Sequence, residues 1–278
     1  RVVDTVLGCL SQIAPTRIMA AGEGGNTVVA LGGYDENRQP FVLVDMINGA
    51  WGGRHNRDGV EGVTNPSQNM SNLPIETIEA RYPVMMEEYS LRPDSCGAGK
   101  YRGGLGLTRQ YRLLAREAML QMRADRYVTA PYGLFGGGEG ERSKNILNPD
   151  HAPEALPSKL TRQVGAGTVV RHEQAGAGGY GNPLQGARVL DAFAGTGALG
   201  LEALSRGAAH AGFLENGAVA LALLKRNIAL MRAGESCEIL RRDAVRPGAN
   251  PAAAYDLVFL DPPYGKSLGE AVLPALLA

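Results

Sequence analysis

The chain has 278 residues, which is enough for one large domain or two ordinary ones. Its 28 basic and 28 acidic residues cancel, with 19 of each sign before Gly186 and 9 of each after it, so neither part has the positive excess typical of non-specific nucleic-acid binding. No stretch approaches the ~20 apolar residues of a membrane span. Three widely spaced cysteines show no metal-ligand or redox spacing, so we expect reduced thiols in a cytoplasmic protein.

The first expected element is a helix over residues 4–13. Because the chain begins inside this segment, at Arg1 and without a methionine, we expect the natural N-terminus to be missing. The part before Gly186 holds 27 of the 38 glycines, and short stretches with β character alternate there with Gly, Pro and Asn turns: 27–31, 41–47, 107–114 and 168–172. This pattern predicts a β-rich fragment with long glycine-rich loops.

Two glycine runs, 136–138 and 176–179, are the densest in this part. Neither lies between a clear strand and a clear helix, as a phosphate-binding glycine loop would, so we interpret them as turn chemistry. The segment 51–59 crowds polar and basic side chains into a loop. His55 and Asp58 could share a metal ion or a proton there, but two ligands without a third favour a hydrogen-bonded loop. Cys96 could be a nucleophile, although no partner base is visible.

The texture changes after Gly186, where strands and helices alternate. An apolar run over 187–193 ends in a glycine-rich turn, and the following elements are a helix, a strand, a longer helix, two strands and a final helix: 198–206, 210–215, 218–232, 237–241, 255–260 and 268–277. Continuous apolar strands separated by helices predict a parallel sheet covered on both faces, that is, a Rossmann-like α/β fold with a partly complete sheet. We therefore divide the chain into residues 1–184 and 185–278.

Acidic residues follow successive strands of this second part. Asp191 precedes the turn that contains Gly195 and Gly197, where missing side chains would let a ligand lie against the backbone. Glu215 ends the next strand and could accept the hydrogens of both ribose hydroxyls, and Asp243 after the third strand could meet an adenine edge. A dinucleotide enzyme has a similar turn and a similar acid, so these residues indicate a nucleoside without naming the cofactor.

The deciding motif is Asp261-Pro262-Pro263-Tyr264, at the end of the fourth strand. Methyl transfer to an exocyclic nitrogen needs the amine held with its lone pair toward the methyl donor. The Asp261 carboxylate and the Pro262 carbonyl could accept the amine's hydrogens, while the prolines stiffen the turn and Tyr264 offers a flat face for an extruded base. A dehydrogenase has no use for this tetrad, and an amino methyltransferase does.

With the segments 189–208, 213–215 and 227–228, these motifs resemble the bacterial 16S ribosomal RNA guanine-N2 methyltransferases. The resemblance implies a class I methyltransferase fold, S-adenosylmethionine as the methyl donor and a guanine amine in ribosomal RNA as the acceptor. It implies catalytic roles for Asp261, Pro262, Pro263 and Tyr264. It also implies that the cofactor is bound by Asp191, Ala194, Gly195, Thr196, Gly197, Glu215, Asp243 and Ala244. We expect this domain to be truncated, because such proteins have further strands after the tetrad.

The N-terminal part resembles the C-terminal part of the hydantoinase B/oxoprolinase family. The resemblance rests on segments 20–24, 49–54 with 58–59, 72–76, 91–104, 157–159 and 178–183. It implies a share in the ATP-dependent opening of cyclic amides such as 5-oxoproline or hydantoins, beside a hydantoinase A-type partner. It assigns no active-site residue in residues 1–184.

Methyl transfer to a nucleobase amine is the function that the sequence favours, because its site residues can be named. The alternative is a fragment of a cyclic amide hydrolase, which more of the chain supports. A second alternative is an inactive fusion, since two incomplete families joined without a linker suggest a truncated or artificially joined reading frame.

Overall fold

A computed structural model describes residues 2–25, 27–248, 250, 253–263 and 268–277. The chain divides into two compact units, residues 1–183 and 184–278, and each is described by itself. We call them unit 1 and unit 2. None of the helices in the described residues has the length and apolar content needed to cross a membrane.

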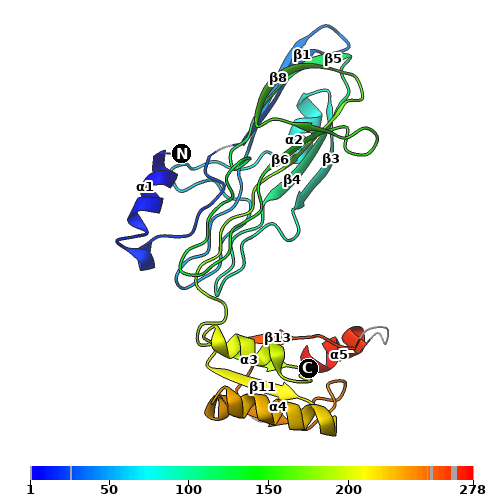
Figure 1. The fold of residues 1–278 in the computed structure, drawn as a ribbon. Coiled ribbons are helices and arrows are strands. Elements are labelled where there is room, and N and C mark those ends of the chain that lie inside the picture. The colour runs from blue at the N-terminus through cyan, green and yellow to red at the C-terminus, as the bar shows by residue number, and fades with distance from the viewer. Residues whose placement is uncertain (1, 26, 249, 251–252, 264–267, 278) are drawn as a thin grey trace. The chain divides into compact units, whose positions relative to one another are not determined.

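Unit 1 contains two antiparallel sheets (Figure 1). The first has the order β2-β1-β5-β8, with strands Pro40–Ile47, Thr27–Tyr34, Glu117–Arg123 and Lys159–Gly165. The second has the order β3-β4-β9-β6-β7, with strands Val84–Leu91, Leu107–Leu113, Val169–Glu173, Lys144–Leu147 and Glu154–Leu156. The helical elements of this unit are α1 (Val2–Leu10), η1 (Pro15–Arg17) and α2 (Ile75–Arg81).

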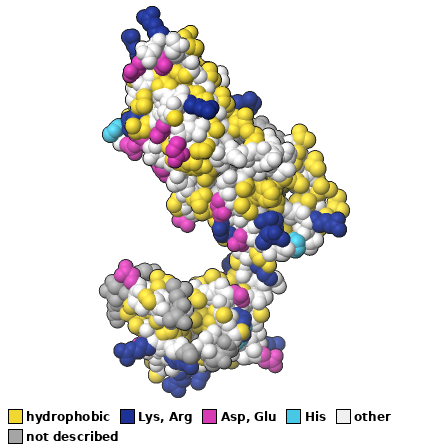
Figure 2. Space-filling model, turned by 180° about the vertical axis from the view of Figure 1, so that it is seen from behind, with side chains coloured by type: hydrophobic (Ala, Val, Ile, Leu, Met, Phe, Trp, Pro, Cys, Tyr) yellow, Lys and Arg dark blue, Asp and Glu magenta, His cyan; other side chains and the backbone are white. Residues whose placement is uncertain are grey.

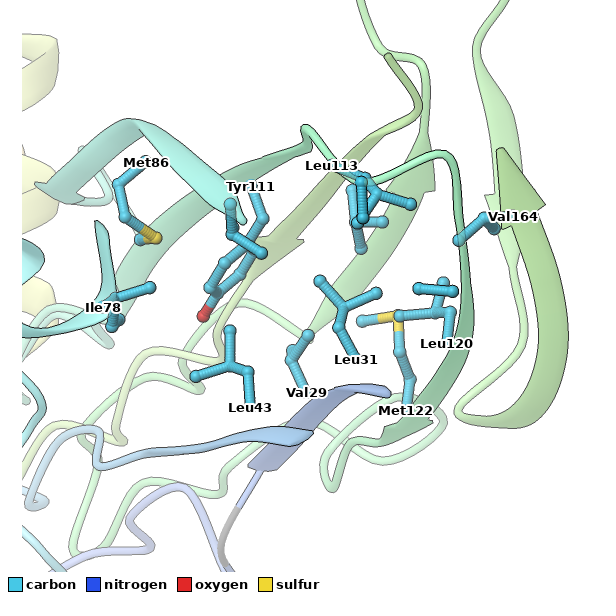
Figure 3. Close-up of a cluster of buried hydrophobic side chains, with 14 of the residues drawn as sticks. Val29, Leu31, Leu43, Ile78, Met86, Tyr111, Leu113, Leu120, Met122 and Val164 are labelled. Carbon is cyan, nitrogen blue, oxygen red and sulfur yellow. The ribbon is translucent and has the colours of Figure 1, made fainter. Parts of the chain in front are cut away.

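The two sheets share one apolar core, to which each of their strands contributes buried side chains. Strand β2 shows the reason, since its side chains alternate strictly between exposed and buried, with Leu43 fully buried. Figure 3 shows Leu43, Val29 and Leu31 of the first sheet facing Tyr111 and Leu113 of the second. Burying one such side chain contributes about 1.5–3 kcal/mol, so this core supplies much of the unit's stability.

A buried ion pair joins the two sheets across this core. Asp45 on β2 and Arg109 on β4 are paired, and both side chains are 0% exposed. The Tyr111 hydroxyl donates a 2.7 Å hydrogen bond to the same Asp45 oxygen, and the Arg109 guanidinium lies 4.1 Å from the centroid of the Tyr89 ring. Because each partner comes from a different sheet, the pair fixes how the sheets face one another.

The glycine-rich loops form a structure of their own, which we call the glycine bundle: residues 20–25, 49–60, 95–106, 131–141 and 175–181. Its segments run side by side and are bonded through their backbones (Figure 1). Three consecutive residues bond to three different neighbours: the Ala177 nitrogen to Gly104, the Gly178 nitrogen to Ala21 and the Gly179 nitrogen to Gly138. A strand in a sheet has only two neighbours, so the bundle packs more closely than a sheet.

This packing, and not turn chemistry, accounts for most of the glycines. A Cβ would overlap a carbonyl oxygen of an adjacent segment at Gly52, Gly59, Gly97, Gly103, Gly137, Gly176, Gly178 and Gly179. None of these eight has a positive φ, whereas Gly136 and Gly181, at φ 91° and 77°, do. Our interpretation of the runs 136–138 and 176–179 as turns therefore holds for few of their residues.

Glu23 is a buried acid beside the bundle. Its side chain accepts a hydrogen bond from the Gln174 amide, its second oxygen has no hydrogen-bond partner among the described residues, and the residue is 3% exposed. Burial raises the pKa of Glu23 to about 8, from an ordinary value of 4.5. Glu23 is therefore protonated in the folded chain at neutral pH.

We expect the stability of unit 1 to fall as pH rises from about 4.5 to about 8. In this window the folded chain holds the Glu23 proton and the unfolded chain has released it, so rising pH favours unfolding. Glu23→Gln removes the titration. Urea unfolding at pH 5 and pH 8 should show a smaller pH dependence for Glu23→Gln than for the parent chain. An unchanged pH dependence would show that Glu23 titrates normally.

Unit 2 is built on a parallel sheet of order β12-β11-β10-β13, with strands Cys237–Leu240, His210–Leu214, Arg188–Asp191 and Leu257–Phe259. Helices α3 (Ala198–Ser205) and α4 (Ala218–Leu230) pack on one face, where Leu201 and Leu224 meet Phe213. Helix α5 (Leu268–Leu277) covers the other face through Val272, and η2 (Gly234–Ser236) precedes β12. The predicted fold class, a β-rich part followed by a Rossmann-like parallel sheet, is confirmed.

Candidate functional site

A cleft opens in unit 2 at the carboxyl ends of the four parallel strands. The chain order of the strands reverses between β10 and β13, and ligands bind at such switch points in doubly wound sheets. The cleft has a volume of about 470 Å³, within the range of small-molecule sites. Of the residues predicted to form the site, it is lined by Gly195, Glu215, Asp243, Ala244, Asp261, Pro262 and Pro263.

Glu215 is held rigidly at the centre of this cleft. One of its oxygens accepts a 2.8 Å hydrogen bond from the Gly195 nitrogen, and the other accepts bonds of 2.9 Å and 2.7 Å from the nitrogens of Asn216 and Gly217. Each carboxylate oxygen has a further lone pair. Glu215 can therefore accept hydroxyl hydrogens while its orientation stays fixed.

Asp191 supports the site from behind and does not line the cleft. Its side chain is 1% exposed and accepts a 3.0 Å hydrogen bond from the Gly200 nitrogen in the first turn of α3. Burial raises the pKa of Asp191, and the charges of Asp261 and Glu215 add to the effect. The three carboxylates thus lie close enough for their charges to interact.

Three further predicted residues shape the turn without lining the cleft. Gly197, at φ 82°, caps α3, and a Cβ there would strike the Leu224 side chain. The Ala194 nitrogen donates to the Leu214 carbonyl, and the Thr196 carbonyl accepts a 2.9 Å hydrogen bond from the Asn227 amide. These residues hold the turn between β10 and α3 in place.

Tyr264, the last residue of the predicted catalytic tetrad, lies outside the described residues. Sequence reasoning missed several residues that do line the cleft: Ala192, Phe193, Leu214, Asn216, Arg242 and Leu268. All of these except Leu268 directly adjoin a predicted site residue, so the motif boundaries were drawn too narrowly. Arg242 is the only basic residue among the described lining residues, and its guanidinium donates to the Pro247 carbonyl at 2.8 Å.

The candidates in unit 1 do not assemble into a catalytic group. Asp58 pairs with Arg102, whose backbone nitrogen lies 3.0 Å from one carboxylate oxygen, and no contact joins Asp58 to His55 among the described residues. Cys96 is a half-buried free thiol. Across the described part of the chain, no three His, Cys, Asp or Glu residues are placed to hold a metal ion.

Comparison with known proteins separates the same two parts. The profile of the family described as hydantoinase B/oxoprolinase matches residues 1–183. A protein of Pseudomonas sp. (strain NS671), described as the B component of a D-/L-hydantoinase, is 35% identical over 66% of this chain and 31% of its own length. The ATP-dependent caprolactamase from Pseudomonas jessenii is 26% identical with a TM-score of 0.53, over 63% of this chain and 32% of its own. The chain thus spans about a third of either relative.

The second part matches a different family, described as conserved hypothetical protein 95, over residues 173–278. A solved structure named "Putative methyltransferase yhhF from Escherichia coli" is 38% identical over 34% of this chain and 51% of its own, with a TM-score of 0.31. The chain therefore belongs to the hydantoinase B/oxoprolinase family through residues 1–183, and a second part that resembles class I methyltransferases follows them.

Proposed function

We propose that unit 2 transfers a methyl group from S-adenosylmethionine to an exocyclic amine of a nucleobase, and that the acceptor is guanine N2 in 16S ribosomal RNA. The observation that carries this proposal is the use of backbone nitrogens around the glycine turn. A dinucleotide-binding fold points such nitrogens at a pyrophosphate. Here the Gly195 nitrogen is bonded to Glu215 and the Gly200 nitrogen to Asp191.

Charge supports the same choice of cofactor. The described lining residues of the cleft carry three carboxylates, Glu215, Asp243 and Asp261, against the single guanidinium of Arg242. Buried Asp191 stands behind them. A dinucleotide would bring two negative phosphates into this field, whereas S-adenosylmethionine brings a sulfonium and an ammonium group against one carboxylate. The residues therefore fit a cationic cofactor.

Asp261 and Pro262 account for the acceptor class. Both line the cleft directly after β13, beside the carboxyl end of β10. In the proposed reaction, the Asp261 carboxylate and the Pro262 carbonyl accept the hydrogens of the incoming amine and direct its lone pair into the cleft. When bound, the cofactor would supply the electrophilic methyl group. Positioning, and not a strong base, is the contribution of the chain.

The first test is calorimetric titration of the full chain with S-adenosylhomocysteine, S-adenosylmethionine and NAD⁺. We expect binding of the first two and not of NAD⁺. Glu215→Gln should weaken binding by about 10- to 100-fold, because a hydrogen bond to a charged group contributes about 1.5–3 kcal/mol. Glu235→Gln, an equal charge change on an exposed residue outside the cleft, is the control. Binding of NAD⁺ alone, or equal effects of the two variants, would contradict the proposal.

Asp261→Ala separates chemistry from cofactor binding. It should abolish methyl transfer to 16S ribosomal RNA while leaving the affinity for S-adenosylhomocysteine within a few fold of the parent. Transfer is followed with radiolabelled S-adenosylmethionine and digestion to nucleosides. Label on a base other than guanine would revise the acceptor, and unchanged transfer would remove Asp261 from the site.

For unit 1 we propose a second activity, the ATP-dependent hydrolysis of a cyclic amide together with a hydantoinase A-type partner protein. Family membership of residues 1–183 supports this proposal. The chain matches about a third of its hydantoinase relative, so the missing residues of such a protein would have to come from elsewhere. Co-purification with a hydantoinase A-type protein, followed by an assay of hydantoin and 5-oxoproline hydrolysis, tests it. An A-type protein that neither binds the chain nor hydrolyses either amide with it would exclude this activity.

A further inference from the structure

A basic hollow lies in unit 1 beside the turn 54–57. The Arg54 nitrogen donates a 2.9 Å hydrogen bond to the Arg57 carbonyl, so the turn holds these two arginines close together. Arg17, at the end of η1, is the third arginine of the hollow, and His55 also lines it. The hollow has a volume of about 430 Å³.

No acid compensates these charges. None of the residues that line the hollow is acidic, and among the described residues no carboxylate lies within ion-pair distance of Arg17, Arg54 or Arg57. The nearby carboxylate of Asp58 is engaged by Arg102, and Arg54 reaches only the backbone carbonyl of Asp58, at 2.9 Å. The hollow therefore has a positive potential that an anion would relieve.

Arg54 is the least satisfied of the three. Its Nε atom is buried and has no hydrogen-bond partner among the described residues. Burial lowers the pKa of Arg54, and the neighbouring charge of Arg57 lowers it further. Both observations indicate a guanidinium that is kept partly dehydrated beside a like charge. Such a group gains more from an incoming anion than a solvated arginine does.

The other wall of the hollow is apolar. Leu7 of α1, Ile18, Met19 and Pro66 line it, and Trp51 lies beneath Arg54, whose guanidinium is 5.8 Å from the ring centroid. Basic and apolar side chains also lie next to one another on the surface of unit 1 in the space-filling view (Figure 2). A bare inorganic anion would leave the apolar wall and most of the 430 Å³ unused. The lining therefore fits an anionic group attached to a small apolar body.

We propose that Arg17, Arg54 and Arg57 bind the phosphate group of a small organic phosphate monoester, whose organic part lies against Leu7, Ile18 and Met19. Three guanidinium groups suit a dianion with three oxygens better than a carboxylate, which has two oxygens and one charge. The site is independent of the cleft in unit 2, so it stands or falls apart from the proposed methyl transfer.

The test is calorimetric titration of the full chain with inorganic phosphate, phenyl phosphate and benzoate. We expect phenyl phosphate to bind most tightly, because it has both the dianion and the apolar body. The variant R17Q/R57Q should weaken its binding by about tenfold or more, since each lost charged hydrogen bond contributes about 1.5–3 kcal/mol. Both arginines are exposed, so the fold should be kept, which circular dichroism checks.

The matched control is R81Q/R116Q, which removes two exposed arginines that do not line the hollow. It should bind phenyl phosphate as the parent does. Four results would overturn the proposal: no binding of phenyl phosphate by the folded chain, equal losses in both double variants, equal binding of phenyl phosphate and inorganic phosphate, or tighter binding of benzoate. The second would indicate general charge attraction, the third would remove the apolar contact, and the last would assign a carboxylate site.

Discussion

Gly137→Ala is expected to destabilise unit 1 by about 3 kcal/mol or more, because the new methyl group has no space to occupy. A Cβ at Gly137 would overlap the carbonyl of Gly179 and approach the Tyr180 nitrogen at 2.6 Å. These are backbone atoms bonded to other segments of the glycine bundle, so they cannot move aside alone. The residue does not have a positive φ, so the loss would come from packing and not from backbone strain.

The control is the next residue in the chain. At Gly138 a Cβ would meet only the Ala98 backbone at 3.4 Å and 3.5 Å, which is ordinary contact, and φ is again not positive. Gly138→Ala should therefore change stability by no more than about 1 kcal/mol, and could raise it by restricting the unfolded chain. Fluorescence of Trp51, the sole tryptophan and a residue of unit 1, reports urea unfolding of this unit. Equal losses at both positions would contradict the packing argument, and a dominant loss in Gly136→Ala would restore the turn interpretation.

Asp45→Ala should cost about 3–5 kcal/mol of unfolding free energy, the range for breaking a buried ion pair by removing one partner. The variant leaves the Arg109 charge 0% exposed without its carboxylate, and the Tyr111 hydroxyl loses its acceptor. Because Asp45 and Arg109 lie on different sheets, the loss should appear as cooperative unfolding of the whole unit. The same Trp51 signal follows it.

Two further variants identify the cause of that loss. Glu36→Ala removes an exposed carboxylate of unit 1 and should leave stability within about 0.5 kcal/mol of the parent. The double variant Asp45→Leu/Arg109→Met replaces the pair by apolar side chains of similar size and should be more stable than Asp45→Ala. A double variant as unstable as Asp45→Ala would show that the fold requires these polar groups themselves.

The sequence predicted most clearly those elements whose residues agree with their structure locally. Helices α3 and α4 and strands β1 and β2 lie where apolar periodicity placed them. Strands β5 and β8 were missed. Strand β5 reads Glu-Ala-Met-Leu-Gln-Met-Arg, residues that favour helices, and its alternation becomes meaningful only when β1 pairs with it. Strand β8 is a polar edge strand, whose burial pattern gives little signal.

The cleft in unit 2 was accessible to sequence reasoning for a topological reason. Residues that follow parallel strands meet at one edge of the sheet, so Glu215, Asp243 and Asp261 could be grouped without a structure. Whether a side chain faces the cleft was not accessible, and Asp191 turns inward to Gly200. The basic hollow could not be predicted either, because Arg17 reaches the turn 54–57 only through the tertiary fold.

The glycine bundle also determines when unit 1 can finish folding during synthesis. Its contacts join distant parts of the chain: Gln174 bonds to Glu23 across 151 positions, and the Tyr180 hydroxyl to Pro15 across 165. A segment with three sets of neighbours has no partial lattice to join until the last segment, 175–181, has left the ribosome. Such a contact order predicts slow folding, with the earlier segments exposed to misassociation in the nascent chain. The glycines that allow the closest packing therefore also make the chain dependent on its own late residues, and on chaperones until those emerge.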